Sequence, residues 1–209
     1  MKRLLFPLLL SLPVCSAWSA DRLQVPVPPV SGVPTGSASL AGSDLKAASP
    51  EMLSVIRALS GRWAMDVTFE PTPDAPKGAQ GKGEEFWHPG AQGLTLIDEE
   101  NINVPPLDIH LLGLLWWDSA TKQFRGMECV NQNPHACDPK ASLSDVSIAW
   151  DGKQLTIDEM ETSPTGKKSQ WHETYSEITA SSFLQVGESG EPGGPFKKVV
   201  TLRGTRIDR

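Results

Sequence analysis

Apolar and polar residues alternate over residues 62–69 of this chain, with Trp63, Met65, Val67 and Phe69 at every second position. Successive side chains of a β-strand point to opposite faces, so this period predicts a strand with one buried face. Segments of similar character, bounded by turn residues, predict further strands. They cover residues 83–88, 94–103, 109–118, 123–131, 145–150, 154–161, 169–177, 182–188 and 196–206.

The connections between these segments carry turn residues and no helical pattern. Residues 71–78 are too rich in proline for a central strand, and Asp151-Gly152 is a candidate type I′ hairpin turn. About ten strands without intervening helices predict an all-β fold, an antiparallel up-and-down β-barrel of about 8–10 strands. A two-sheet sandwich is the alternative, but a barrel leaves no long edge exposed.

One short N-terminal helix is expected before the first strand. Ser49 followed by Pro50 is typical of a helix start, and Gly61 of a helix end. The residues between them place four apolar side chains on one face: Met52, Val55, Ile56 and Leu59. So short a helix is marginal alone and must pack that face against the barrel. Residues 109–117 are apolar on both faces, and we expect the helix to cover the outer one.

The chain is expected to divide into three parts. Residues 1–20 have the basic start, short apolar run and small residues of a signal peptide, with cleavage after Ser19 or Ala20. The apolar run is too short to be a transmembrane segment, and a lipid on Cys15 is the alternative to cleavage. Residues 21–48, rich in Pro, Gly and Ser, predict a disordered linker. Residues 49–209 then form the barrel domain of a periplasmic or secreted protein.

Charge narrows the possible partners. Without Lys2 and Arg3 of the leader, 17 basic residues face 25 acidic ones. Surfaces that bind nucleic acids or anionic membranes need clustered Lys and Arg, so neither partner is expected.

The helix, the Gly61-x-Trp63 segment, the Trp116-Trp117-Asp118 strand end and the Gly193-Gly194 turn resemble the lipocalin-like, or calycin, superfamily of β-barrels. More closely, the chain resembles an uncharacterised bacterial domain-of-unknown-function family.

The resemblance implies structural roles for Gly61 and Trp63, with Arg203 or Arg206 from the last strand covering the Trp63 ring. The related haem-binding barrels continue their tryptophan motif with glycines. Ala64-Met65-Asp66 follows Trp63 here, so we expect no haem and no other cofactor.

Two cysteines follow the leader, Cys129 and Cys137, with a turn-forming Asn133-Pro134 between them. In an exported protein this pair predicts a disulfide. A metal site with His135 is the alternative, but it lacks a fourth ligand, and no metal is expected.

Tryptophan is the most unusual feature of the composition. Large rings fill a barrel or line a pocket in it, and the expected wall residues are Trp87, Trp117, Trp150 and Trp171. Glu173 shares a strand face with Trp171 and Tyr175, and could hold the polar end of a ligand. Alternatively, Glu173 pairs with a lysine of a neighbouring strand.

Catalytic motifs are lacking, which makes an enzyme the less favoured class. Glu159 and Glu161 share a face, but such a stripe is usually solvated surface. The leading hypothesis is a protein that binds a small apolar or amphipathic molecule. A filled barrel acting as a protein-interaction module is the second. An enzyme that joins Glu173 to His88 or His110 is the third.

Overall fold

The computed structural model describes residues 47–72, 75–131, 146–162 and 166–207. The expected leader and almost all of the expected linker lie outside these residues, so both stay predictions.

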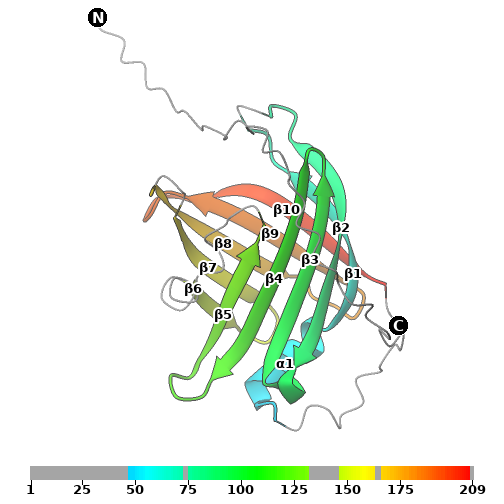
Figure 1. The fold of residues 1–209 in the computed structure, drawn as a ribbon, viewed down its shortest axis with the longest axis vertical. Helices are drawn as coiled ribbons and strands as arrows, with labels where there is room; N and C mark the ends of the chain where they lie inside the picture. Colours follow the sequence, from blue (N-terminus) through cyan, green and yellow to red (C-terminus); the bar gives the residue numbers. More distant parts are fainter. Residues whose placement is uncertain (1–46, 73–74, 132–145, 163–165, 208–209) are drawn as a thin grey trace, which may run out of the picture. The chain divides into compact units, whose positions relative to one another are not determined.

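The described chain forms one α-helix, one short 3₁₀ helix and ten strands (Figure 1). Their bounds are α1 (Pro50–Leu59), β1 (Gly61–Phe69), β2 (Ala79–Gly90), η1 (Ala91–Gly93), β3 (Thr95–Val104), β4 (Leu107–Asp118), β5 (Gln123–Val130), β6 (Val146–Trp150), β7 (Leu155–Thr162), β8 (Lys168–Ser176), β9 (Ser182–Gly190) and β10 (Lys197–Arg206).

Each strand pairs antiparallel with its neighbours in the sequence, and β10 pairs with β1 to close the barrel. The predicted up-and-down barrel is confirmed, and the sandwich is wrong. Closure gives every strand two partners, so no strand of the described sheet has a free edge.

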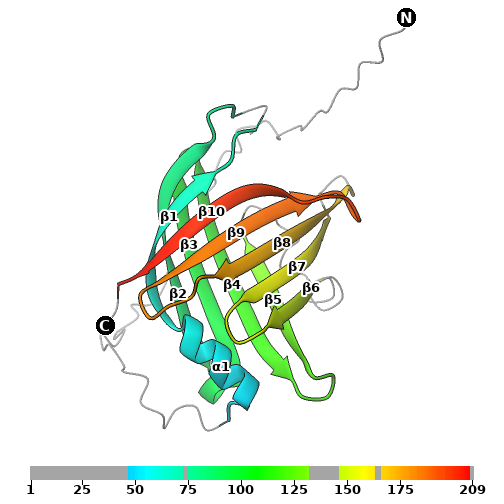
Figure 2. The same cartoon turned by 180° about the vertical axis from the view of Figure 1, so that it is seen from behind.

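α1 lies across one end of the barrel (Figure 2). The Ser49 side chain accepts a hydrogen bond from the Met52 amide at 3.2 Å and caps the first turn. The predicted apolar face, from Met52 to Leu59, is buried in the barrel core. The expectation that α1 covers the outer face of residues 109–117 is wrong. Because α1 fills the barrel end instead, Leu112 on the outside of β4 is 45% exposed.

Side-chain contacts stabilise the pairing of β1 with β10 where α1 meets the barrel. Trp63 is fully buried, and its Nε1 donates to the Leu59 carbonyl at 2.9 Å. Arg206 lies opposite Trp63 in the β1–β10 register, with its guanidinium carbon 4.0 Å from the ring centroid. Arg206 also donates to the carbonyls of Ser60 at 2.6 Å and Ala180 at 2.7 Å. Of the two arginines considered, Arg206 makes this contact, and Arg203 is exposed.

Gly61 connects α1 to β1 with a φ of 140°, a conformation that glycine adopts without strain. The hairpin between β6 and β7 is confirmed, but its turn is not type I′. Among residues 151–154 only Gly152 has a positive φ, and type I′ requires two such residues. Asp151 Oδ1 instead accepts from the amides of Lys153 and Gln154 and holds a longer turn.

Within the part of the chain that the structure describes, no helix has the length and apolar character needed to cross a membrane.

Replacing Arg206 by alanine should lower the free energy of unfolding by about 2–4 kcal/mol, because it removes a cation–π contact and two charge-assisted hydrogen bonds. Denaturant unfolding followed by tryptophan fluorescence measures this change. Arg203→Ala, on the exposed face of the same strand, should stay within about 0.5 kcal/mol of wild type. Equal losses for the two variants would contradict the structural role of Arg206.

Candidate internal binding site

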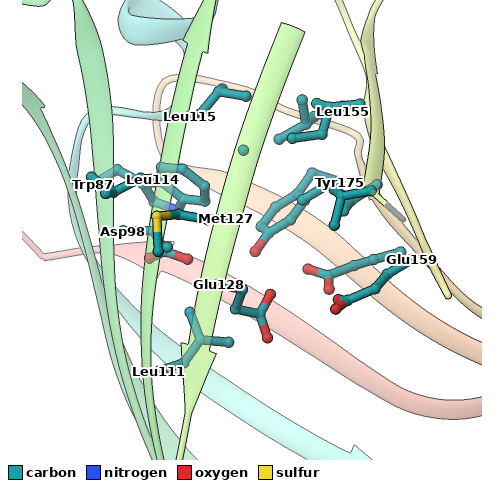
Figure 3. Close-up of a pocket in the computed structure, with 16 residues that line it drawn as sticks. Trp87, Asp98, Leu111, Leu114, Leu115, Met127, Glu128, Leu155, Glu159 and Tyr175 are labelled. Atoms are coloured by element: carbon teal, nitrogen blue, oxygen red, sulfur yellow. The ribbon is translucent and has the colours of Figure 1, made fainter. Parts of the chain in front are cut away.

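A cavity of about 410 Å³ lies inside the barrel. Its wall includes Phe69 at the end of β1 and Val130 at the end of β5, so it occupies the half of the barrel away from α1. A second cavity of about 40 Å³ lies deeper (Figure 3). The two cavities share lining residues Leu111, Glu128, Glu159 and Glu173 and therefore adjoin one another.

Strand alternation decides which side chains reach these cavities. On β3, Leu96, Ile102 and Val104 are buried, and Asp98 and Glu100 between them fall on the same inward face. Glu85 of β2 lies directly opposite Glu100 in the strand register, and Trp87 lies opposite Asp98. The barrel therefore buries carboxyl groups side by side on its inner wall.

Hydrogen bonds within the barrel fix some of these carboxyl groups. Glu173 Oε2 accepts from Trp171 Nε1 at 3.1 Å, and its Oε1 accepts from Gln185 Nε2 at 2.7 Å. Across the barrel, the Tyr175 hydroxyl donates to Glu85 Oε1 at 3.0 Å. Glu173 is thus held in one orientation, with neither oxygen bonded to a lysine.

Other acceptors have no donor. Buried oxygens without a hydrogen-bond partner occur on four side chains of the inner wall: Glu85 Oε2, Asp98 Oδ1, Glu100 Oε1 and Gln185 Oε1. These side chains are between 1% and 5% exposed. A buried acceptor without a donor costs free energy, and these oxygens have almost no surface open to another molecule.

Burial raises the pKa values of the carboxyl groups on the inner wall. It raises the pKa of Glu85 from its ordinary value of 4.5 to about 8. Burial together with neighbouring carboxyl groups raises the pKa of Asp98, Glu100 and Glu128 well above the usual range. The same causes raise the pKa of Tyr175. The surroundings of these groups therefore favour neutral, protonated carboxyls.

Four of the predicted ligand-binding residues line the cavities: Trp87, Trp171, Glu173 and Tyr175. The structure does not bring the other two to either cavity wall. Trp117 packs edge-on against Phe124 at 4.9 Å, and Trp150 Nε1 donates to Ser54 Oγ of α1 at 2.9 Å. Trp117 and Trp150 also pack against the buried core.

Two expectations about acidic residues need correction. Glu159 and Glu161 line the larger cavity and are not part of a solvated outer face. Glu173 bonds to Trp171 and Gln185 and not to a lysine of a neighbouring strand. The prediction that Glu159 and Glu161 face solvent is wrong because closure of the whole barrel determines which face of a strand points inward.

Four residues of the inner wall are not among the site residues that the sequence predicts: Glu85, Asp98, Glu100 and Glu128. A signal for two of them was present on β3. Asp98 and Glu100 stand in phase with Leu96, Ile102 and Val104, whereas acids on an outer face would stand out of phase with the apolar positions.

The three histidines that the structure describes lie on the outer face of the barrel. His88 is bonded to Glu99, His110 to Asn101 and Asp108, and His172 to Asp158. His88 and His110 therefore do not converge with Glu173 inside the cavity, as the enzyme hypothesis required.

Cys129 lies on β5, and its expected partner Cys137 lies outside the described residues, so the disulfide stays a prediction. His135 of the alternative metal site also lies outside them. Among the described residues, no group of three or more His, Cys, Asp or Glu side chains is arranged to hold a metal ion.

The fold and the site define a class: a closed antiparallel β-barrel with an acidic internal cavity. Comparison of the sequence with protein-family models and with curated proteins gave no match.

Solved structures share the fold. The chain is similar to Rv2717c from M. tuberculosis, with 11% sequence identity and a TM-score of 0.52 over 77% of this chain and 99% of that one. It is also similar to a DUF3598-family protein of unknown function from Nostoc punctiforme, with 12% identity and a TM-score of 0.43 over 73% of this chain and 49% of that one. A third similar structure is EF1p2_mFAP2b bound to DFHBI, with 13% identity and a TM-score of 0.40 over 75% of this chain and 99% of that one. At such identities the likeness to Rv2717c shows the fold alone, and it confirms the barrel expected from the resemblance.

The unliganded protein should lose stability as the pH rises from about 4.5 to about 8, the two limits set by the raised pKa of Glu85. In this range the folded state keeps a proton that the unfolded state has lost. One pKa unit corresponds to about 1.4 kcal/mol, so the total loss should reach several kcal/mol. Denaturant unfolding at a series of pH values measures it.

Glu85→Gln keeps an oxygen for the Tyr175 hydroxyl and removes the titration, so its stability should depend less on pH over the same range. Glu84→Gln, exposed on the outer face of the same strand, should follow the wild-type profile. A Glu85→Gln profile indistinguishable from wild type would show that this carboxyl is not buried as described.

Proposed function

We propose that this protein is an exported barrel that binds a small amphipathic molecule in its internal cavity. The observation that carries the proposal is the cavity of about 410 Å³, which combines apolar side chains with carboxyl groups, one of which is held in one orientation. Small-molecule sites typically have volumes of about 300–1,000 Å³, mostly apolar linings and few fixed polar groups.

Apolar side chains from several strands form the wall of the larger cavity. They include Phe69, Ile102, Ile109, Val130 and Leu202. Contact with these side chains would remove the apolar part of a ligand from water, at about 25 cal/mol for each Å² buried.

The carboxyl group held in one orientation is that of Glu173, which two neighbouring side chains contact. Trp171 and Gln185 occupy both of its oxygens, which fixes the carboxyl before any ligand arrives. Gly187 leaves room for the Trp171 ring, since a Cβ at this position would lie 2.4 Å from Trp171 Cζ2. Preorganisation of this kind lowers the entropy cost of binding.

Export rests on the signal-like residues 1–20 and places the protein in the periplasm or outside the cell.

A ligand should be detectable by native mass spectrometry of protein purified after expression of the full chain, or by saturable quenching of tryptophan fluorescence. Trp171→Phe removes both the indole donor to Glu173 and part of the wall, so it should weaken binding about tenfold, equivalent to about 1.4 kcal/mol. Trp116→Phe is the matched control, because Trp116 lines neither cavity.

Equal affinity of the two variants would place the ligand elsewhere on the protein. A protein that carries no ligand and shows unchanged fluorescence with apolar, amphipathic and aromatic compounds would overturn the proposal. The filled barrel that acts as an interaction module would then be the better hypothesis.

Export predicts processing of the chain. Expressed with its own leader in a Gram-negative host, the protein should accumulate in the periplasm and begin after Ser19 or Ala20. Fractionation and intact mass measure this outcome. A mass that shows acylation at Cys15 would replace cleavage with lipid anchoring, and an unprocessed chain in the cytoplasm would contradict export.

A further inference from the structure

We propose that the outer face of the barrel carries a hydrolytic site for small esters. In this site the Thr174 hydroxyl is the nucleophile, His172 is the general base, and Asp158 positions His172. The site is separate from the internal cavity, so the inference goes beyond the proposed function and does not depend on it.

The strand register brings these three side chains together. His172 and Thr174 are two residues apart on β8, so both point to the same face of the sheet. Glu173 between them lines the cavity, which places His172 and Thr174 on the outside. Asp158 of β7 lies directly opposite His172, and Figure 2 shows the two strands side by side. No short sequence motif shows this set, because its members come from two strands.

The hydrogen bonds follow the order of a hydroxyl–imidazole–carboxylate triad. His172 Nδ1 lies 2.7 Å from Asp158 Oδ1, and His172 Nε2 lies 3.1 Å from Thr174 Oγ1. Both distances fall in the range of about 2.6–3.2 Å that a nucleophile and its base require. Among the described residues, the hydrogen bonds of His88 and His110 run to carboxylate and amide groups and not to a hydroxyl.

The chemistry of the partners fixes the proton positions of the neutral imidazole. An ionised carboxylate only accepts, so Nδ1 of His172 carries the proton and donates to Asp158. Nε2 is then an acceptor, and the Thr174 hydroxyl donates to it. This is the arrangement in which an imidazole takes the proton of a hydroxyl nucleophile.

Neighbouring side chains hold the His172 ring and favour a positive charge on it. The Phe196 ring lies beside it, with 5.4 Å between the ring centroids. Glu188 of β9 lies opposite His172 on the side away from Asp158. Two carboxylates on the neighbouring strands favour the charge that the imidazole gains when it takes a proton. The His172 side chain is still 26% exposed, so a substrate can reach it from solvent.

A groove beside the site limits the size of the substrate. It has a volume of about 160 Å³, and its wall includes Asp158, Met160, Gln170 and Phe196. Sites for drug-sized molecules have volumes of about 300–1,000 Å³. The groove therefore has room for a small, partly apolar group only.

The surroundings of Thr174 favour esters over amides. β8 pairs with both β7 and β9 along its length, so the described strands offer no free pair of backbone amides to stabilise an oxyanion. The Thr156 hydroxyl, directly opposite Thr174, is a donor on the neighbouring strand. With so little stabilisation of the transition state, only substrates with a good leaving group react at a measurable rate.

The reaction consists of two acyl transfers. Thr174 Oγ1 attacks the carbonyl carbon of the ester and gives its proton to His172 Nε2. The bond between that carbon and the alcohol oxygen breaks, and the alcohol leaves with the proton from Nε2. Water then attacks the acylated Thr174 and passes a proton through Nε2 to Thr174 Oγ1, which releases the acid. Asp158 remains ionised throughout.

The test is hydrolysis of p-nitrophenyl acetate by the full chain, with peptide mass spectrometry to identify the acylated residue. An acetyl group should appear on Thr174. Thr174→Val keeps the shape and removes the hydroxyl, so the initial rate should fall at least about tenfold. His172→Gln should cause a similar loss. Thr174→Ser restores a hydroxyl and should retain activity.

The positioning role of Asp158 has its own measurement. Asp158→Asn supplies an amide that can donate to Nδ1, so Nε2 carries the proton and no longer accepts from Thr174. Its kcat should fall at least about tenfold, with KM within about twofold of wild type. Thr68→Val, on the exposed outer face of β1, and His88→Gln are the matched controls and should hydrolyse the ester like wild type.

The outcomes separate this inference from the proposed function. Thr174→Val that hydrolyses as fast as wild type, or acetylation of other residues and not of Thr174, would overturn the inference. Wild-type hydrolysis no faster than that of His172→Gln would do the same. The three side chains would then only join the surfaces of β7 and β8. Because they face outward, ligand binding in the cavity should be unchanged in Thr174→Val whatever the result.

Discussion

The pairing of β1 with β10 is the constraint on which the rest of this structure depends. This pairing is stabilised beside α1, where the Arg206 guanidinium covers Trp63 and donates hydrogen bonds to two backbone carbonyls. Without it, both strands would expose unpaired edges, and the alternating inward face would not be enclosed. An inside and an outside exist only because the sheet closes. Closure therefore decides which members of each alternating strand become core and which become surface.

The inner face of the closed barrel differs between the half near α1 and the half away from it. Near α1 the inner face holds Trp63, Phe183 and the apolar side chains of the helix, and the space is filled. Farther from α1 the same alternation brings Glu85 and Glu100 into direct opposition, with further carboxyl groups around them. Removing so many ionisable groups from water lowers stability unless they are protonated or neutralised by another molecule. The filled half of the barrel supplies the apolar burial that offsets this cost.

Most of the architecture was predictable, because strand and helix periods are local properties of a sequence. The alternation from Trp63 to Phe69 and the Ser49-Pro50 helix start both gave the observed elements. The binding site was less predictable. It depends on which face of each strand points inward and on how far along the barrel axis each side chain lies. In β7, Leu155 and Ile157 are in phase with Glu159, but Met160 on the other face made the phase ambiguous. The prediction that Trp117 and Trp150 line the cavity is wrong because no sequence period shows how near α1 a side chain lies.

The dependence of stability on pH follows from one physical cause. The barrel holds acceptors in place by backbone pairing and by hydrogen bonds such as Gln185 to Glu173, so they cannot turn away from one another. At low pH the carboxyl groups with raised pKa values are protonated, and the barrel is at its most stable. At higher pH the same groups ionise and repel one another. The free energy that destabilises the barrel above neutral pH therefore comes from the same buried carboxyl groups that line its cavity.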